Sequence, residues 1–297
     1  MDQIPMNRTL HIKLTVMAFL WAGGFISAKT IASDAGPFTI CFLRFLIATV
    51  LIAMIARQRE QPAVWDLRLF GMVLGAAFLG VFCYNFFFFT GIRYLDAGRG
   101  SVIVSTVPIV VTMISAVLFR ERLGVLKYAG IGVSLVGAWI VISKGAMLSL
   151  FEMHIGKGEF LMMGCVLCAA GFTLFSNAML IRLTPLNLIA AVSALGTAFV
   201  SGPALLELQY APARMGSYSF VLNLLYLAAG PSVIAVIFSY DAIKSVGPSR
   251  ASQYMNLMPV FSVILAMVFL GEHITGSLVL GGGLVTTGLY LTNAGAA

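Results

Sequence analysis

Charged side chains are scarce in this sequence. Lys, Arg, Asp and Glu make up only 10% of its 297 residues, whereas 60% of the residues are hydrophobic. A soluble globular domain carries about 25% charged residues, so this chain cannot cover a water-facing surface. We therefore predict a multi-pass protein of the cell (inner or plasma) membrane, surrounded by the lipid bilayer.

Several kinds of functional group are also missing. The three His residues stand apart, and the CxxC pair of Cys165 and Cys168 lies in an apolar run without a second Cys pair or a His cluster. No nucleotide-binding glycine loop, HExxH motif or convincing catalytic triad occurs. The net charge of +7 is spread singly or in small groups between apolar runs, unlike the basic stripe of a nucleic-acid-binding protein. The sequence thus predicts neither an enzyme nor a cofactor, a metal site or a nucleic-acid partner.

What the sequence does contain is ten apolar runs, each near the roughly 20 residues that a helix needs to cross the hydrocarbon core. They cover residues 12–31, 36–56, 68–91, 98–119, 124–143, 158–181, 185–206, 217–240, 250–270 and 274–293. We predict an all-α membrane protein with ten transmembrane helices. Eleven Lys and Arg residues fall on one side of this arrangement and five on the other, so the positive-inside rule predicts that both termini are cytoplasmic.

The second half of the sequence repeats the first half at a constant offset of 151 residues. The matched pairs include Pro108 and Pro259, Glu121 and Glu272, Gly130 and Gly281, and Gly137 and Gly288. We predict two repeats, residues 1–147 and 148–297, with five spans each. Because five is odd, the second repeat must be inverted relative to the first. Inverted repeats are typical of secondary transporters, whose substrate site lies between them.

Several motifs resemble a known family. The run PIVVTMISAVLFRE at residues 108–121 resembles the helix four/five signature of the drug/metabolite transporter superfamily, and PVFSVILAMVFLGE at residues 259–272 is a closer match. WAGGF at residues 21–25 and PFTICFLRF at residues 37–45 resemble the EamA-type members. The resemblance covers nearly the whole chain. It implies a ten-helix exporter or exchanger of amino acids, metabolites or drugs, with a central cavity formed mainly by helices one, three, four, six, eight and nine.

Two pairs of spans are broken at matched positions, which is a good sequence indicator of a transporter site. Gly80 in the third span corresponds to Pro231 in the eighth, and Pro108 in the fourth corresponds to Pro259 in the ninth. A proline removes one backbone hydrogen bond, and the freed carbonyl either bends the helix or faces a wet cavity. We predict hinges or gates at these four residues, with a fixed packing kink as the alternative.

Aromatic and polar residues collect near the level of these breaks. Aromatic walls with a few polar groups describe a typical small-molecule pocket, whereas single aromatic residues also serve as lipid contacts. A stripe of hydroxyl residues on the fourth span either lines the cavity or packs helices closely. The predicted substrate-binding residues are Trp21, Phe25, Tyr84, Asn85, Ser105, Phe172, Ser176, Tyr254 and Asn256.

Charges inside the spans are few. Arg44 lies about 12 Å along the second span, and the offset places it on Leu195, so its role is not symmetric. Arg44 either attracts a substrate carboxylate or phosphate, or it has a structural role and donates hydrogen bonds to the backbone of a neighbouring helix. The family resemblance implies an Arg at this position in members with differing substrates, which favours the structural role. Glu121 and Glu272 end their spans, which predicts capping or interhelical locking. With no acidic residue near a midplane, facilitated diffusion or exchange fits at least as well as proton coupling.

These features together predict a secondary transporter that exports small metabolites by alternating access, with amino acids as the leading class. The alternatives are a nucleotide-sugar or sugar-phosphate antiporter, a multidrug exporter and, outside transport, a membrane sensor or scaffold. Glycines seven residues apart recur in the fifth and tenth spans. They predict close helix contact, either between these two helices or in a homodimer.

Overall fold

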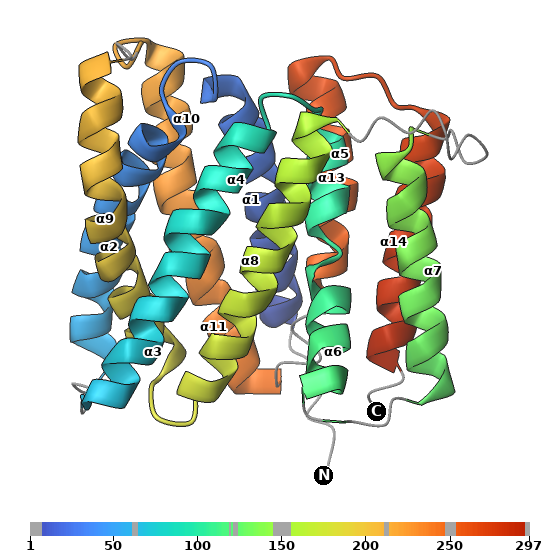
Figure 1. The fold of residues 1–297 in the computed structure, drawn as a ribbon, viewed down its shortest axis with the longest axis horizontal. Helices are drawn as coiled ribbons and strands as arrows, with labels where there is room; N and C mark the ends of the chain where they lie inside the picture. The colour runs from blue at the N-terminus through green and yellow to red at the C-terminus, as the bar shows by residue number, and fades with distance from the viewer. Residues whose placement is uncertain are drawn as a thin grey trace. The chain divides into compact units, whose positions relative to one another are not determined.

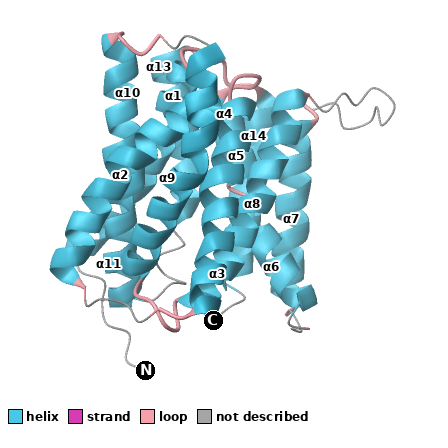
Figure 2. Cartoon of the chain, turned by 60° about the vertical axis from the view of Figure 1, so that its left-hand side comes forward, coloured by secondary structure: helices cyan, strands magenta, loops and turns pink. Residues whose placement is uncertain are grey.

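The structure, a computed structural model, contains only helices and their connections in the part of the chain that it describes (Figure 2). This part is residues 8–60, 65–118, 120, 124–144, 156–210, 214–246 and 254–294, without the side chains of residues 240, 243, 244, 246, 293 and 294. Within these residues, eight helical stretches are long and apolar enough to span a membrane, and two shorter ones, Tyr254–Leu270 and Gly276–Thr292, complete the ten. The predicted set of ten transmembrane helices is confirmed.

The helices follow the predicted spans closely (Figure 1). Their bounds are α1 (Arg8–Ile31), α2 (Pro37–Arg59), α3 (Leu67–Ala77), η1 (Phe78–Cys83), α4 (Tyr84–Gly91), α5 (Ala97–Val104), α6 (Val107–Leu118), α7 (Val125–Ile142), α8 (Lys157–Met179), α9 (Pro185–Tyr210), α10 (Tyr218–Ala229), η2 (Gly230–Ile234), α11 (Ala235–Val246), η3 (Tyr254–Asn256), α13 (Leu257–Leu270) and α14 (Gly276–Ala294). The segments η1 and η2 are π-helical, and η3 is a 3-10 turn.

Local sequence signals fix several helix starts. Pro37 occupies the beginning of α2, where its missing N–H costs nothing. Asp66 precedes α3 and accepts a hydrogen bond from the Leu69 N–H at 2.7 Å, and it also pairs with Arg182 at 2.7 Å. The Leu69 N–H and the Arg182 guanidinium together hold the pKa of the Asp66 carboxyl below its ordinary value. The Asp66 carboxylate is thus a charged N-cap, which fixes the start of α3 at the edge of its apolar run.

The chain forms two compact units, and each contains segments from both halves of the sequence. One unit comprises residues 27–95 and 157–233, and the other comprises the residues up to 26, residues 96–156 and those from 234 onward. The units differ from the predicted repeats because corresponding helices of the two halves pack against each other. Helix α2 packs along α9 in one unit, and α7 packs along α14 in the other. The repeat boundary at residues 147 and 148 stays a prediction about the duplication.

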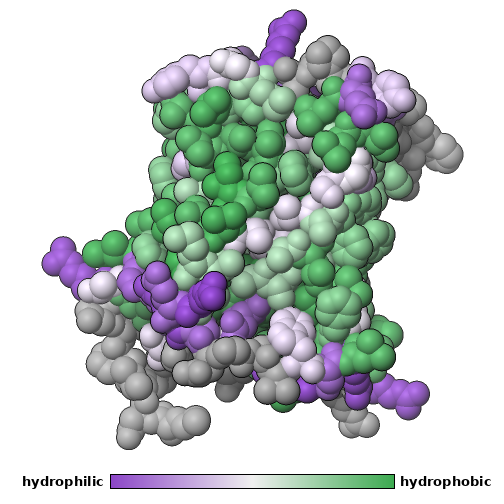
Figure 3. All heavy atoms as spheres, turned by 90° about the vertical axis from the view of Figure 1, so that its left-hand side faces the viewer, coloured by the Kyte–Doolittle hydropathy of each residue, from purple (hydrophilic) through white to green (hydrophobic). Residues whose placement is uncertain are grey.

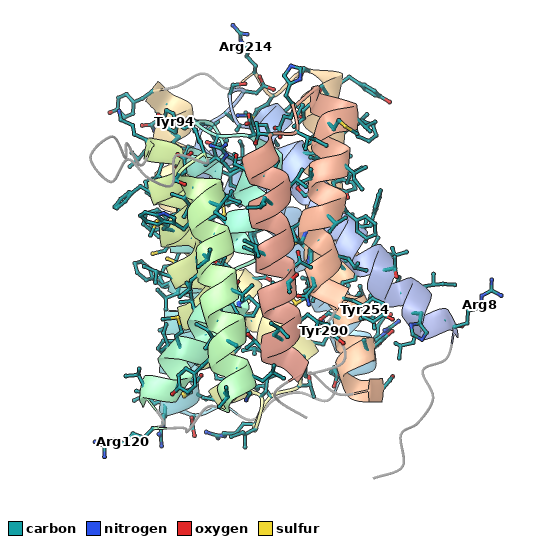
Figure 4. All side chains as sticks on the ribbon, turned by 90° about the vertical axis from the view of Figure 1, so that its right-hand side faces the viewer. Arg8, Tyr94, Arg120, Arg214, Tyr254 and Tyr290 are labelled. Carbon is teal, nitrogen blue, oxygen red and sulfur yellow. The ribbon has the colours of Figure 1, made fainter. Side chains whose placement is uncertain are left out.

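In the second of these units, four glycines let α7 and α14 run in close contact (Figure 4). A Cβ atom at Gly137 would lie 2.6 Å from the carbonyl oxygen of Gly281, and one at Gly288 would lie 2.5 Å from that of Gly130. Since the earlier glycine of one helix meets the later glycine of the other, the two helices are antiparallel, as inverted repeats require. The glycines therefore serve the contact within the chain, which is one of the two roles predicted for them.

Hydrophobic side chains cover much of the outer surface. In Figure 3 they fill the middle of the visible face, and hydrophilic side chains gather toward its two ends. In α9 and α10, large side chains such as Leu205, Leu206 and Leu222 are exposed. An apolar band of this kind is suited to lipid rather than water.

Candidate substrate site in the membrane-spanning helices

Two π-helical segments interrupt spans that correspond in the two repeats. Gly80 lies in η1 and Pro231 lies in η2, so the matched breaks predicted from the sequence both depart from α-helical geometry. A π-helical turn is rare in proteins and occurs often at functional sites, because it displaces backbone groups from their usual i to i−4 partners. In both segments a side chain also bonds to a nearby backbone carbonyl.

In η1 this side chain is Asn85. Its Nδ2 donates to the carbonyl oxygen of Val81 at 2.8 Å and lies 3.5 Å from that of Gly80. The Cys41 thiol of α2 also contacts the Val81 carbonyl, at 3.8 Å. Asn85 is only 1% exposed, so its amide is committed to this backbone. Asn85 thus stabilises the irregular turn from the start of α4.

In η2 the corresponding side chain is Ser232. Pro231 has no N–H, so the carbonyl of Leu227, four residues before it, loses its usual donor. The Ser232 hydroxyl donates to this same carbonyl at 2.8 Å. The residue next to the proline therefore replaces the hydrogen bond that the proline removes.

Arg44 of α2 contacts both of these side chains. Its Nε donates to Ser232 Oγ at 2.8 Å, and its Nη1 donates to Asn85 Oδ1 at 3.4 Å. The guanidinium also lies 5.2 Å from the centre of the Phe45 ring. The structural role predicted from the sequence was a set of hydrogen bonds from Arg44 to neighbouring backbone carbonyls. In the structure Arg44 instead binds Asn85, which holds a carbonyl of η1, and Ser232 of η2, which holds a carbonyl at the end of α10. One cation therefore joins both irregular segments.

The charge of Arg44 has no carboxylate beside it within the described residues. Neither the Lys13–Asp241 ion pair nor the Arg182–Asp66 ion pair includes Arg44. A guanidinium has five N–H donors, and the bonds to Ser232 and Asn85 use two of them. A cation in a membrane-spanning helix that keeps spare donors is able to receive an anionic group.

Further predicted residues lie in the same compact unit. The ring of Phe172 in α8 lies against Gly80, where an added Cβ would be 2.5 Å from a ring carbon. Tyr84 stacks on Phe88, with ring centres 5.9 Å apart. Ser176, one turn beyond Phe172, is buried, and its hydroxyl has no hydrogen-bond partner among the described residues. An unpartnered buried hydroxyl is a candidate contact for a polar ligand.

The other unit holds the remaining predicted residues. Trp21 and Tyr254 both pack against a small apolar cluster contributed by α1 and α11. Tyr254, which is labelled in Figure 4, lies in η3, and its hydroxyl bonds to His11 Nδ1. Phe25 is buried, and Asn256 precedes α13 without capping it through its side chain. The structure therefore brings Trp21 and Tyr254 together on one cluster.

The second pair of predicted breaks also coincides with irregular backbone. Helix α5 ends at Val104 and α6 begins at Val107, just before Pro108. The 3-10 turn η3 precedes the helix that carries Pro259. The hydroxyl of Ser105 donates to the carbonyl of Val102 in the preceding turn at 2.7 Å, so its proton is used within its own span, while its oxygen can still accept a hydrogen bond. The role of the four breaks as hinges stays a prediction.

Two carboxylates bind the N-termini of neighbouring helices. Glu272 accepts from the N–H groups of Ala97 and Gly98 at 2.7 and 3.1 Å, which caps α5. Its repeat partner Glu121 lies outside the described residues. Glu207 of α9 accepts from the Thr39 N–H and hydroxyl at 2.8 and 2.9 Å, and so caps α2. Both contacts place a negative charge at the positive end of a helix dipole.

Replacing Glu272 by alanine is expected to destabilise the folded protein by about 1–2 kcal/mol, because two N–H groups of α5 lose their acceptor. The measurement is thermal unfolding in detergent, and His273→Ala is the matched control, since His273 is exposed in the same connection. Equal unfolding temperatures for the two variants would contradict a capping role for Glu272.

The amino-acid sequence can now be compared with those of known proteins. A sequence profile of the EamA-like transporter family matches residues 10–143 and 156–294, which is nearly all of the chain. The chain belongs to this family. The EamA-like protein is 29% identical over 294 residues to an uncharacterized transporter of Archaeoglobus fulgidus, covering 97% of this chain and 99% of the relative. It is 25% identical over 287 residues to the uncharacterized transporter YetK of Bacillus subtilis, covering 95% and 86%.

The fold of this EamA-like protein also occurs in a solved structure. One crystal structure with 18% identity covers 96% of this chain and 98% of its own, with a TM-score of 0.69. Membership of the family makes the protein a multi-pass membrane transporter and not an enzyme. The residues that sequence reasoning missed are Ser232 and Glu207. The position of Ser232 next to Pro231 was a usable signal, because a hydroxyl there can replace the lost hydrogen bond.

Proposed function

We propose that this EamA-like transporter exports small metabolites, with amino acids as the leading class, by alternating access. The observation that carries the proposal is the pair of π-helical breaks at repeat-matched positions, held together by Arg44. Broken spans in corresponding positions mark the binding region of repeat-built transporters. A cation without a neighbouring carboxylate suits a substrate with a carboxylate group, and the aromatic residues of the same unit suit the rest of an amino acid.

The other transport alternatives fit these contacts less well. A phosphate carries more charge than a carboxylate and is usually bound by several basic side chains or by helix N-termini, whereas the described contacts place Arg44 alone at the two irregular segments. A cationic drug would be repelled by the same guanidinium. A sensor or scaffold would bind a solute without moving it, so only a measurement of solute movement across a bilayer distinguishes it from a transporter.

The test is counterflow into proteoliposomes preloaded with a mixed pool of unlabelled amino acids. Wild-type protein is expected to accumulate labelled amino acids, and Trp21→Ala and Asn256→Leu are each expected to lower the initial rate about tenfold, which corresponds to the loss of one good contact. Trp139→Ala is the matched control for Trp21→Ala, because Trp139 is partly exposed on α7. It is expected to transport like the wild type.

The outcomes separate the candidate functions. Folded wild-type protein that moves no amino acid would reject this substrate class. Counterflow of sugar phosphates would then favour the antiporter reading, and the absence of movement for every class of solute would favour a sensor. Equal rates for Trp21→Ala, Asn256→Leu and wild type would reject the proposed substrate contacts.

A further inference from the structure

We propose that the outer edge of the Arg44 guanidinium binds the carboxylate of the transported solute, beside Asn85 and Ser232. The proposal deepens the function proposed above and rests on it for the identity of the solute. It identifies the ligand group as a single carboxylate, bound at one position within the unit of residues 27–95 and 157–233.

The first step is a count of hydrogen-bond donors. Arg44 carries five N–H groups, and two of them bind Ser232 Oγ and Asn85 Oδ1. The described residues provide no acceptor for the other three, which are the two on Nη2 and the second on Nη1. One N–H of Nη1 and one of Nη2 can form a two-pronged planar fork, which matches the two oxygens of a carboxylate.

The second step concerns charge. Arg44 lies in the membrane-spanning part of α2 and is only partly exposed, a setting in which an uncompensated cation is unfavourable. The two side-chain groups that it binds, the Ser232 hydroxyl and the Asn85 amide, are neutral. Glu207 of the same unit is held instead by the N-terminal N–H groups of α2. A solute carboxylate would supply the missing negative charge.

The third step concerns orientation. The two side chains that Arg44 binds are themselves fixed to helix backbone, Ser232 through the Leu227 carbonyl and Asn85 through the Val81 carbonyl. The plane of the guanidinium is therefore set before any ligand arrives, and a preorganised donor loses little entropy on binding. The structural and binding roles of Arg44 use different edges of the same group, so one role does not exclude the other.

The experiment compares an acid with its amide, because the two differ only at the group that Arg44 would bind. Purified protein in detergent is titrated with leucine and with leucinamide, and the shift in unfolding temperature gives an apparent dissociation constant for each. Wild-type protein is expected to bind leucine about 10- to 100-fold more tightly, the range for hydrogen bonds to a charged group. Arg44→Gln is expected to reduce this ratio to about one, a change that a merely structural role would not produce.

Two further variants keep the test decisive. Arg182→Gln makes the same chemical change in the same unit, at an exposed arginine paired with Asp66, and is expected to keep the wild-type ratio. If Arg44→Gln does not fold, Arg44→Lys replaces it, because lysine keeps the charge but lacks the planar fork. Arg44→Lys is expected to keep only a few-fold preference for leucine.

A second pair of probes, acetate and acetamide, separates this proposal from the proposed function. If wild-type protein moves no amino acid but acetate stabilises it through Arg44, the amino-acid function is wrong and the carboxylate site stands. If inorganic phosphate stabilises the protein more strongly than acetate, the assigned ligand class is wrong. The proposal is also overturned if Arg44→Gln keeps the full preference for leucine, or if folded wild type distinguishes neither pair.

Discussion

Gly137→Ala is expected to destabilise the protein by about 1–3 kcal/mol, the usual cost of overpacking a tight contact. The added methyl would lie 2.6 Å from the carbonyl oxygen of Gly281 and 2.7 Å from the backbone nitrogen of Val285. Both atoms belong to the backbone of α14, so no side chain can turn aside and the two helices must separate. Thermal unfolding in detergent, with the folded fraction after purification, measures the effect.

Gly132→Ala is the matched control on the same helix. An added Cβ at Gly132 meets nothing within 4 Å, and alanine is a better helix former than glycine by about 1 kcal/mol. The same substitution is therefore expected to have opposite signs at two positions five residues apart. Gly281→Ala is expected to match Gly137→Ala. Equal stability for the variants at Gly137 and Gly132 would mean that α7 and α14 do not meet through these glycines.

The parts of the fold that the sequence predicts well are those determined by local composition. Each span is a long apolar run, and its length alone identifies a membrane helix. The matched positions of Gly80 and Pro231 also depend only on a comparison of the two halves. The duplication further limits the glycine contacts, since inverted repeats make α7 and α14 antiparallel. Prediction therefore succeeds where neighbouring residues, or residues at one fixed offset, carry the signal.

The candidate site is less predictable because its contacts join distant segments. Arg44 binds Ser232, which is 188 residues away, and Asn85, which is 41 residues away. No periodicity reveals that these helices meet at that level. Glu207 was missed for a related reason, since the seventh span was predicted to end at residue 206 and α9 in fact continues to Tyr210. The sequence identified breaks at Gly80 and Pro231 but could not indicate that both turns are π-helical.

The interleaving of the two compact units has the same origin. A division of the sequence into halves treats each repeat as a body that packs within itself. In a membrane, helices associate through close packing of small residues rather than by hiding apolar surface from water. A pair of matched helices with small residues on facing sides, such as α7 and α14, can therefore pack across the repeat boundary. Each compact unit consequently includes segments of both repeats.

Gly80→Ala is expected to lower counterflow about tenfold or more, because its methyl would lie 2.5 Å from the Phe172 ring inside the π-helical segment η1. Gly75→Ala is the control in the same span, since a Cβ there would meet Phe175 at an ordinary 3.6 Å. It is expected to leave transport near the wild-type rate. Together the two variants test whether the space beside Gly80 is needed for transport.

A second substitution identifies the cause of the loss. If the clash with the ring is responsible, Gly80→Ala should be less harmful in a Phe172→Ala background, with a coupling of about 0.5–3 kcal/mol between contacting residues. If the two losses simply add, the ring is not the obstacle. The defect would then come from the backbone of η1, where alanine favours regular α-helix over the π-helical turn. Additive losses would therefore contradict the contact with Phe172 while leaving the predicted hinge at Gly80 in place, and a positive coupling would tie transport to the space between this ring and the irregular helix.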